Sequence, residues 1–147
     1  MTAPIVHEPG QGEGADLGFV HFAIKAGIED TEGAYSFVEA SGNVFATPHI
    51  HHDREESFFV LEGKVTFLAG DGTVDGTPGS FVLVPRGTMH GFRAEGEARL
   101  LVMHSPGGFE RFFTESAAAI AEGRWSIEWR DGIARELGMT YFDDVEI

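Results

Sequence analysis

The sequence contains no cysteine among its 147 residues. Disulfide bonds and thiolate metal ligands are therefore excluded, and a metal site would have to use histidine or oxygen ligands. No stretch approaches the roughly 18 consecutive apolar residues that a membrane-spanning helix needs. Residues 1–18 also lack the basic and apolar segments of a signal peptide. We therefore expect a cytoplasmic protein that does not enter membranes.

Basic side chains are scarce, with 10 Lys and Arg against 24 Asp and Glu and a net charge of −14. Proteins that bind nucleic acid hold its phosphates with clustered Lys and Arg, so we expect no nucleic-acid partner. Hydrophobic residues make up 42% of the chain, which is typical of a globular protein. The length suits one compact domain with its own core.

Residues 19–105 consist of short apolar runs separated by Gly, Pro and Asp-Gly turn signals. In the run VHFAI at 20–24, apolar and other side chains alternate, as in a half-buried strand. Many short strands at regular spacing predict an all-β antiparallel sandwich or barrel. The strands that we expect cover 20–24, 35–40, 47–52, 57–63, 64–70, 80–85, 89–94 and 98–105.

The pattern changes after the last of these strands. Ser105 can cap a helix and Pro106 can open it, and the apolar residues within 109–120 follow helical spacing. A second, shorter helix is expected over 128–137. We therefore expect a single domain, 1–147, made of an N-terminal arm (1–18), a barrel (19–105) and a helical C-terminal cover (106–147).

A histidine cluster is the most informative feature of the sequence. His49 and His51 share one face of an expected strand, about 6–7 Å apart, while His52 lies on the opposite face. Two imidazoles on one face can bind one cation. A carboxylate from the pair at 55–56 could supply a third ligand, and His90 on a later strand could supply a fourth. The isolated histidines His7, His21 and His104 are interpreted as surface or core residues.

Two motifs with this histidine cluster resemble those of the cupin superfamily, G-x5-H-x-H-x3,4-E-x6-G and G-x5-P-x-G-x2-H-x3-N. The first is matched by His49, His51, Glu56 and Gly63, and the second by Gly79, Pro85, Gly87 and His90. Two departures occur. Six residues rather than five separate Gly42 from His49, and Ala94 stands where the second motif has Asn.

The resemblance implies a cupin double-stranded β-helix, or jelly-roll barrel, with one or two C-terminal helices. It also implies that His49, His51, Glu56 and His90 are the metal ligands, because the register to Gly63 selects Glu56 over Glu55. Three imidazoles and one carboxylate suit a divalent Fe, Mn, Ni, Co, Cu or Zn ion better than Ca or Mg.

Within cupins, the stretches TPHIHHDREESFFVLEGKVTF and VPRGTMHGFR look most similar to quercetin 2,3-dioxygenase-like proteins. This resemblance implies a mononuclear metal dioxygenase that uses dioxygen on a flavonol or another enol-bearing aromatic small molecule. Glu56 would be catalytic and take the proton of the substrate hydroxyl, and Glu55 is the alternative candidate for this role. The residues expected to line the substrate pocket are Phe58, Phe92, Met103, Phe109 and Phe113.

Two other functions remain open at this point, because one fold hosts many chemistries. One is a non-oxidative metal-dependent isomerase or polyketide cyclase, in which Glu56 or His52 would move protons. The other is a non-catalytic module that binds small molecules. A homodimer is implied by the resemblance alone.

Overall fold

The computed structural model describes residues 3–147, which form eleven strands and two helices. The strands are β1 (Glu13–Asp16), β2 (Val20–Ala26), β3 (Ser36–Gly42), β4 (Phe45–His51), β5 (Glu55–Glu62), β6 (Val65–Ala69), β7 (Gly72–Gly76), β8 (Phe81–Val84), β9 (His90–Ala94), β10 (Ala98–Ser105) and β11 (Met139–Tyr141). The helices are α1 (Glu110–Ala121) and α2 (Ile127–Glu136).

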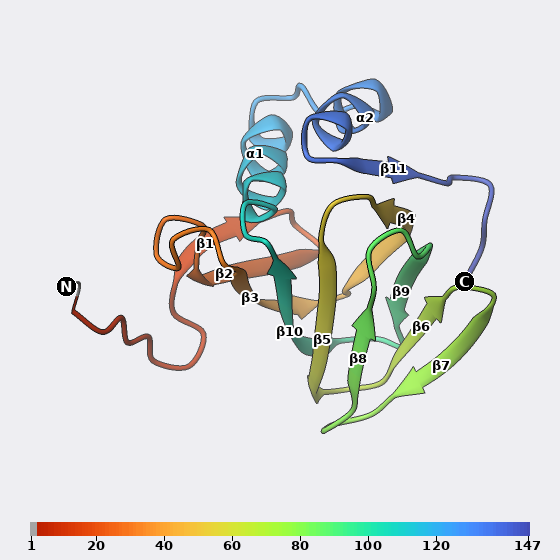
Figure 1. Cartoon of the computed structure of the whole chain (residues 1–147), viewed down its shortest axis with the longest axis horizontal. Helices are drawn as coiled ribbons and strands as arrows, with labels where there is room; N and C mark the ends of the chain where they lie inside the picture. The colour runs from red at the N-terminus through yellow and green to blue at the C-terminus, as the bar shows by residue number, and fades with distance from the viewer. Residues whose placement is uncertain (1–2) are drawn as a thin grey trace.

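The strands form two antiparallel sheets. One has the order β1-β2-β3-β10-β5-β8 and the other has the order β11-β4-β9-β6-β7. Figure 1 shows both helices and β11 together at one end of the molecule. The expected all-β fold with C-terminal helices is confirmed, and the arrangement is that of a jelly roll.

The core lies between the sheets because each strand turns alternate side chains inward. In β10 the buried positions are Ala98, Leu100, Val102 and His104, and the residues between them are partly exposed. In β5, Phe58 and Val60 are buried on the same face as Glu56. The alternation therefore places one carboxylate and one imidazole among apolar core residues.

The structure explains why the first motif has glycine at position 63. Its φ is +83°, and a Cβ atom there would lie 2.6 Å from the carbonyl oxygen of Glu97. Only glycine fits this close approach between the turn after β5 and the start of β10. The motif glycine thus sets the turn that fixes the register of β5, and with it the inward direction of Glu56.

The first helix begins later than expected. Ser105 is the last residue of β10, so it does not cap a helix, and the N-cap position of α1 is Phe109, without a side-chain cap. The second helix agrees closely with the expectation. Ser126 caps α2 by accepting a hydrogen bond from the Trp129 backbone N–H at 3.0 Å. Neither helix has the length and apolar character that crossing a membrane requires.

Three strands lie where the sequence predicted none. Within the expected arm, β1 pairs with β2, and Gly12 makes this possible because a Cβ there would lie 2.4 Å from the Ile24 carbonyl oxygen. Asp71 lies in the turn between β6 and β7, as the first Asp-Gly signal predicts, whereas the second Asp-Gly pair, Asp75 and Gly76, lies within the edge strand β7. In the expected helical cover, β11 pairs with β4. The arm and the cover are thus parts of the two sheets.

Candidate metal centre and adjoining cavity

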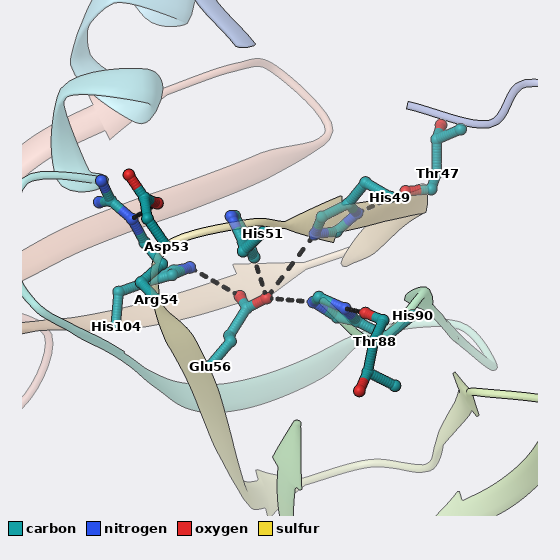
Figure 2. A network of polar contacts seen from close by, with 9 residues as sticks. All are labelled: Thr47, His49, His51, Asp53, Arg54, Glu56, Thr88, His90 and His104. Carbon is teal, nitrogen blue, oxygen red and sulfur yellow. Dashed lines mark hydrogen bonds and ion pairs between the residues drawn. The ribbon is translucent and has the colours of Figure 1, made fainter. Parts of the chain in front are cut away.

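Cross-strand pairs from both sheets build the centre. His49 of β4 lies directly opposite His90 of β9 in one sheet. Glu56 of β5 lies opposite His104 of β10 in the other sheet. Because the inner faces of the two sheets pack against each other, these pairs meet in the barrel interior (Figure 2). His51 lies two residues after His49 on the same face of β4, as the alternation predicts.

The Glu56 carboxylate lies at the middle of four imidazoles. Its Oε1 atom is 3.7 Å from His49 Nε2, 3.3 Å from His51 Nε2 and 2.6 Å from His90 Nε2. Its other oxygen, Oε2, is 2.9 Å from His104 Nε2. All five side chains are buried, with exposed fractions of 5% or less. One carboxylate oxygen therefore belongs to the cluster of three histidines and the other faces the fourth.

Two backbone carbonyls orient two of the imidazoles. His49 Nδ1 donates to the carbonyl oxygen of Thr47 at 2.7 Å, and His90 Nδ1 donates to that of Thr88 at 2.9 Å. Each carbonyl belongs to the residue two positions before its histidine. With the proton on Nδ1, the Nε2 lone pair of each ring is free to bind a metal.

The four residues predicted as ligands fit a single divalent ion. One donor atom from each of His49, His51, Glu56 and His90 lies within 4.8 Å of the others. Ligands at about 2.1 Å from a common metal would be separated by about 3 to 4.2 Å, so only small shifts are needed. Neither ring nitrogen of His51 has a hydrogen-bond partner of good geometry among residues 3–147. A buried imidazole with two unpaired nitrogens is costly unless a ligand takes one of them.

Burial and charge prepare these groups for metal binding. Burial lowers the pKa of His49 to about 4 and also lowers the pKa of His51, so both rings are neutral at neutral pH. Burial alone would raise the pKa of Glu56, but His104 and the neighbouring imidazoles hold that pKa well below 4.5. The pKa of His90 is raised because its contact with Glu56 outweighs its burial. An anionic Glu56 carboxylate beside the neutral rings of His49 and His51 is the protonation state in which these groups bind a cation.

The sequence predicts that His104 is a surface or core residue, and the structure places it in the core, directly against the centre. The signal was the period of β10, because Ala98, Leu100 and Val102 predict that His104 also points inward. Its side chain is completely buried and packs against the Phe109 ring, with the ring centroids 4.4 Å apart. Its Nε2 lies 2.9 Å from Glu56 Oε2, so the two side chains are in direct contact.

Replacing His104 with phenylalanine is expected to weaken metal binding by about 10-fold, because groups that orient a metal ligand contribute on this scale. His104→Gln, which keeps an N–H donor, is expected to bind metal more nearly as the unaltered protein does. Titration of the metal-loaded variants with a competing chelator measures both affinities. Unchanged affinity in His104→Phe would show that the contact with Glu56 Oε2 has no part in metal binding.

The other polar residues near the motif lie outside the centre. His52 is exposed, and its Nε2 lies 2.9 Å from Thr140 Oγ1. Glu55 pairs at the surface with Arg86, with 2.6 Å between Oε2 and Nε. His7 and His21 are also exposed. The structure thus separates Glu56 from Glu55, and His51 from His52, as strand alternation predicts.

A cavity of about 430 Å³ adjoins the centre, and His49 and Glu56 form part of its wall. Most of the wall is apolar, and it includes three of the expected pocket residues: Phe92, Phe109 and Phe113. The cavity extends towards α1, α2 and β11, which contribute Ser116, Ile120, Arg130 and Tyr141. The space beside the centre therefore suits a ligand with a large apolar surface.

Two expected pocket residues do not line this cavity. Phe58 is 1% exposed and packs in the core against Phe67 and Phe92, with ring centroids 5.1 and 5.2 Å away. Met103 alternates with the buried Val102 and His104, so it lies on the outer face of β10. The prediction from sequence relied on nearness along the chain to the ligands, whereas strand register decides which face a side chain occupies.

Tyr141 also lines the cavity and was not predicted from sequence. It lies opposite His49 in the pairing of β11 with β4, and their ring centroids are 5.7 Å apart. Burial raises the pKa of its hydroxyl above the usual value. Arg130 lies over its ring, with Cζ 3.9 Å from the centroid. No spacing rule links residue 141 to a motif that ends near residue 94, so the sequence offered no signal for it.

Comparison with known proteins identifies relatives of this chain. Residues 37–104 match the family model described as "Cupin domain". Quercetin 2,3-dioxygenase from Bacillus subtilis (strain 168) is 30% identical over 115 residues, which is 76% of this chain. The match covers 34% of that relative, so this chain spans about a third of its length.

Solved structures share the fold. An RmlC-like cupin from Shewanella frigidimarina NCIMB 400 aligns with a TM-score of 0.64 and 17% identity, over 74% of this chain and 96% of that one. KdgF from Halomonas sp. aligns with a TM-score of 0.59 and 20% identity, over 67% and 92%. With both cupin motifs in order, this jelly-roll fold and these relatives, the chain belongs to the cupin superfamily.

Proposed function

We propose that this cupin is a mononuclear metal-dependent dioxygenase that acts on a flavonol-like or other enol-bearing aromatic small molecule. The observation that carries the proposal is the position of Glu56. It belongs to the buried ligand cluster and also lines the cavity, so one carboxylate can meet both a metal ion and a substrate hydroxyl.

The cavity supports an aromatic substrate. Its volume of about 430 Å³ lies in the range of small-molecule sites, and Phe92, Phe109, Phe112 and Phe113 supply aromatic wall. Flat rings gain both apolar burial and stacking against such side chains. The 30% identity with quercetin 2,3-dioxygenase favours a flavonol within this class.

The roles of the chain's own residues follow from their positions. His49, His51, His90 and Glu56 would hold the ion, which supplies stabilisation of negative charge on a substrate oxygen when it is bound. Glu56 accepts the proton of the substrate hydroxyl. His104 contacts the Oε2 atom of Glu56 at 2.9 Å and would orient the carboxylate. The phenylalanine wall holds the ring beside the centre and excludes water.

Oxygen consumption with a panel of flavonols tests the proposal. Protein loaded separately with Fe, Mn, Co, Ni or Cu is expected to consume oxygen with at least one flavonol. The absence of consumption with every metal would contradict the proposal. Turnover of an enolisable substrate without oxygen would instead identify a non-oxidative isomerase or cyclase, and a ligand-dependent thermal shift without product would identify a binding module.

Two expectations from the sequence remain predictions. The homodimer is checked by light scattering on the purified protein, and a monomer would contradict it. A cytoplasmic location is checked by fractionating cells that produce the full chain.

A further inference from the structure

Tyr141 contributes a hydroxyl to the cavity wall, and the proposed reaction gives this hydroxyl no role. Tyr141 is one of only two tyrosines in the chain and lies in the otherwise mostly apolar wall. Its hydroxyl forms no hydrogen bond with the other residues described here. By contrast, Arg130 and Asp143 of the same wall satisfy each other, with Nη1–Oδ1 and Nη2–Oδ2 distances of 2.8 and 2.7 Å. Tyr141 thus has a donor and an acceptor available to a ligand.

The strand pairing brings the Tyr141 ring next to His49, one of the proposed metal ligands. Tyr141 and His49 are cross-strand partners, and the side chains of directly opposed residues leave the same face of a sheet. Both side chains line the cavity, with their ring centroids 5.7 Å apart. A ligand at the centre therefore lies beside Tyr141 as well.

The ring of Tyr141 is held firmly. Arg130 lies over its face at 3.9 Å and is itself 6% exposed. The guanidinium is fixed on both sides, by Asp143 and by Asp131, whose Oδ1 accepts from Nε at 3.0 Å and from Nη2 at 2.8 Å. A clamped ring presents its hydroxyl in one place, which reduces the entropy lost when a ligand binds.

We propose that Tyr141 is a substrate-binding residue that selects aromatic ligands with two adjacent oxygens. One ligand oxygen lies at the metal centre, and the Tyr141 hydroxyl donates a hydrogen bond to its neighbour. The hydroxyl carries its proton at neutral pH, as an ordinary tyrosine does. This inference rests on the proposed function for the position of the first oxygen, and it adds a specificity residue on the C-terminal strand β11.

Binding measured without oxygen tests the inference apart from catalysis. The protein is loaded with zinc, which is redox-inert, and titrated with 3-hydroxyflavone and with tropolone, both of which carry adjacent hydroxyl and carbonyl oxygens. Tryptophan fluorescence reports binding, because Trp125 lines the cavity. Tyr141→Phe is expected to weaken the binding of at least one probe by about 3- to 10-fold, the value of one hydrogen bond. Zinc content and thermal midpoint are expected to stay unchanged, because the ring and its contact with Arg130 remain.

Tyr35→Phe is the matched control. This substitution removes the hydroxyl of the other tyrosine, which lies outside the cavity wall. The variant is expected to bind both probes as the unaltered protein does. Equal affinities in Tyr141→Phe and Tyr35→Phe would overturn the inference, as would failure of both probes to bind the zinc-loaded protein. Weaker binding in Tyr141→Phe without oxygen consumption by the redox-metal forms would support Tyr141 and reject the dioxygenase. Oxygen consumption by the redox-metal forms, together with unchanged probe binding in Tyr141→Phe, would support the dioxygenase and reject the role of Tyr141.

Discussion

Replacing His51 with alanine is expected to abolish stoichiometric metal binding. His51 is 2% exposed, both of its ring nitrogens lack a well-formed hydrogen bond, and Nε2 lies 3.3 Å from Glu56 Oε1. Removing the ring deletes one of the ligands that enclose the ion, and the buried carboxylate loses a partner that offsets its charge. His49→Ala is expected to behave in the same way. Elemental analysis of protein purified and dialysed against a weak chelator measures the metal content.

His52→Ala is the matched control for this experiment. His52 follows His51 directly but lies on the opposite face of the strand end, where it contacts Thr140 at the surface. The variant is expected to keep its metal. Metal loss in His52→Ala, or full retention in both His49→Ala and His51→Ala, would show that the strand register of the site is wrong.

Replacing Glu56 with glutamine is expected to reduce turnover of a flavonol by about 10²- to 10⁴-fold for each bound metal ion. The amide keeps the size of the side chain but cannot accept the proton of the substrate hydroxyl, and it removes the charge that the four histidines surround. Oxygen uptake, normalised to the metal content of the same sample, measures the effect. The normalisation separates the loss of the base from the loss of the ion.

Glu55→Gln makes the same chemical change one residue earlier. Glu55 pairs with Arg86 at the surface, and the two side chains are 38% and 52% exposed. Turnover is therefore expected to stay within about twofold of the unaltered protein, because exposed ion pairs contribute little. If Glu55→Gln were inactive and Glu56→Gln active, the assignment of the proton acceptor would be reversed.

Strand alternation and the two motifs were sufficient to predict the barrel and the four residues of the buried cluster. His49 and His51 had to share a face, and Gly63 fixed which glutamate points inward. These features are local, because strand alternation and a tight turn depend only on residues that are close together in the sequence. The alternation of apolar residues along β10 also predicts that His104, near the end of this strand, points into the core.

The C-terminal part of the cavity could not be predicted in this way. The strand β11 has three residues, too few to show the alternation of buried and exposed side chains. Its partner β4 is also far away in the sequence. The stacking of Arg130 on Tyr141 depends on how α2 packs beside that strand. Sequence spacing therefore located the buried cluster of candidate ligands but not the wall that would recognise a substrate.

The most direct test of the metal centre is a crystal structure of the purified protein with anomalous-scattering data collected above and below the absorption edges of first-row metals. We expect one anomalous peak, bounded by the Nε2 atoms of His49, His51 and His90 and by a carboxylate oxygen of Glu56. Metal-loaded crystals with the anomalous peak at another place in the protein would contradict this assignment. Metal-loaded crystals with no peak between these four side chains would also contradict it.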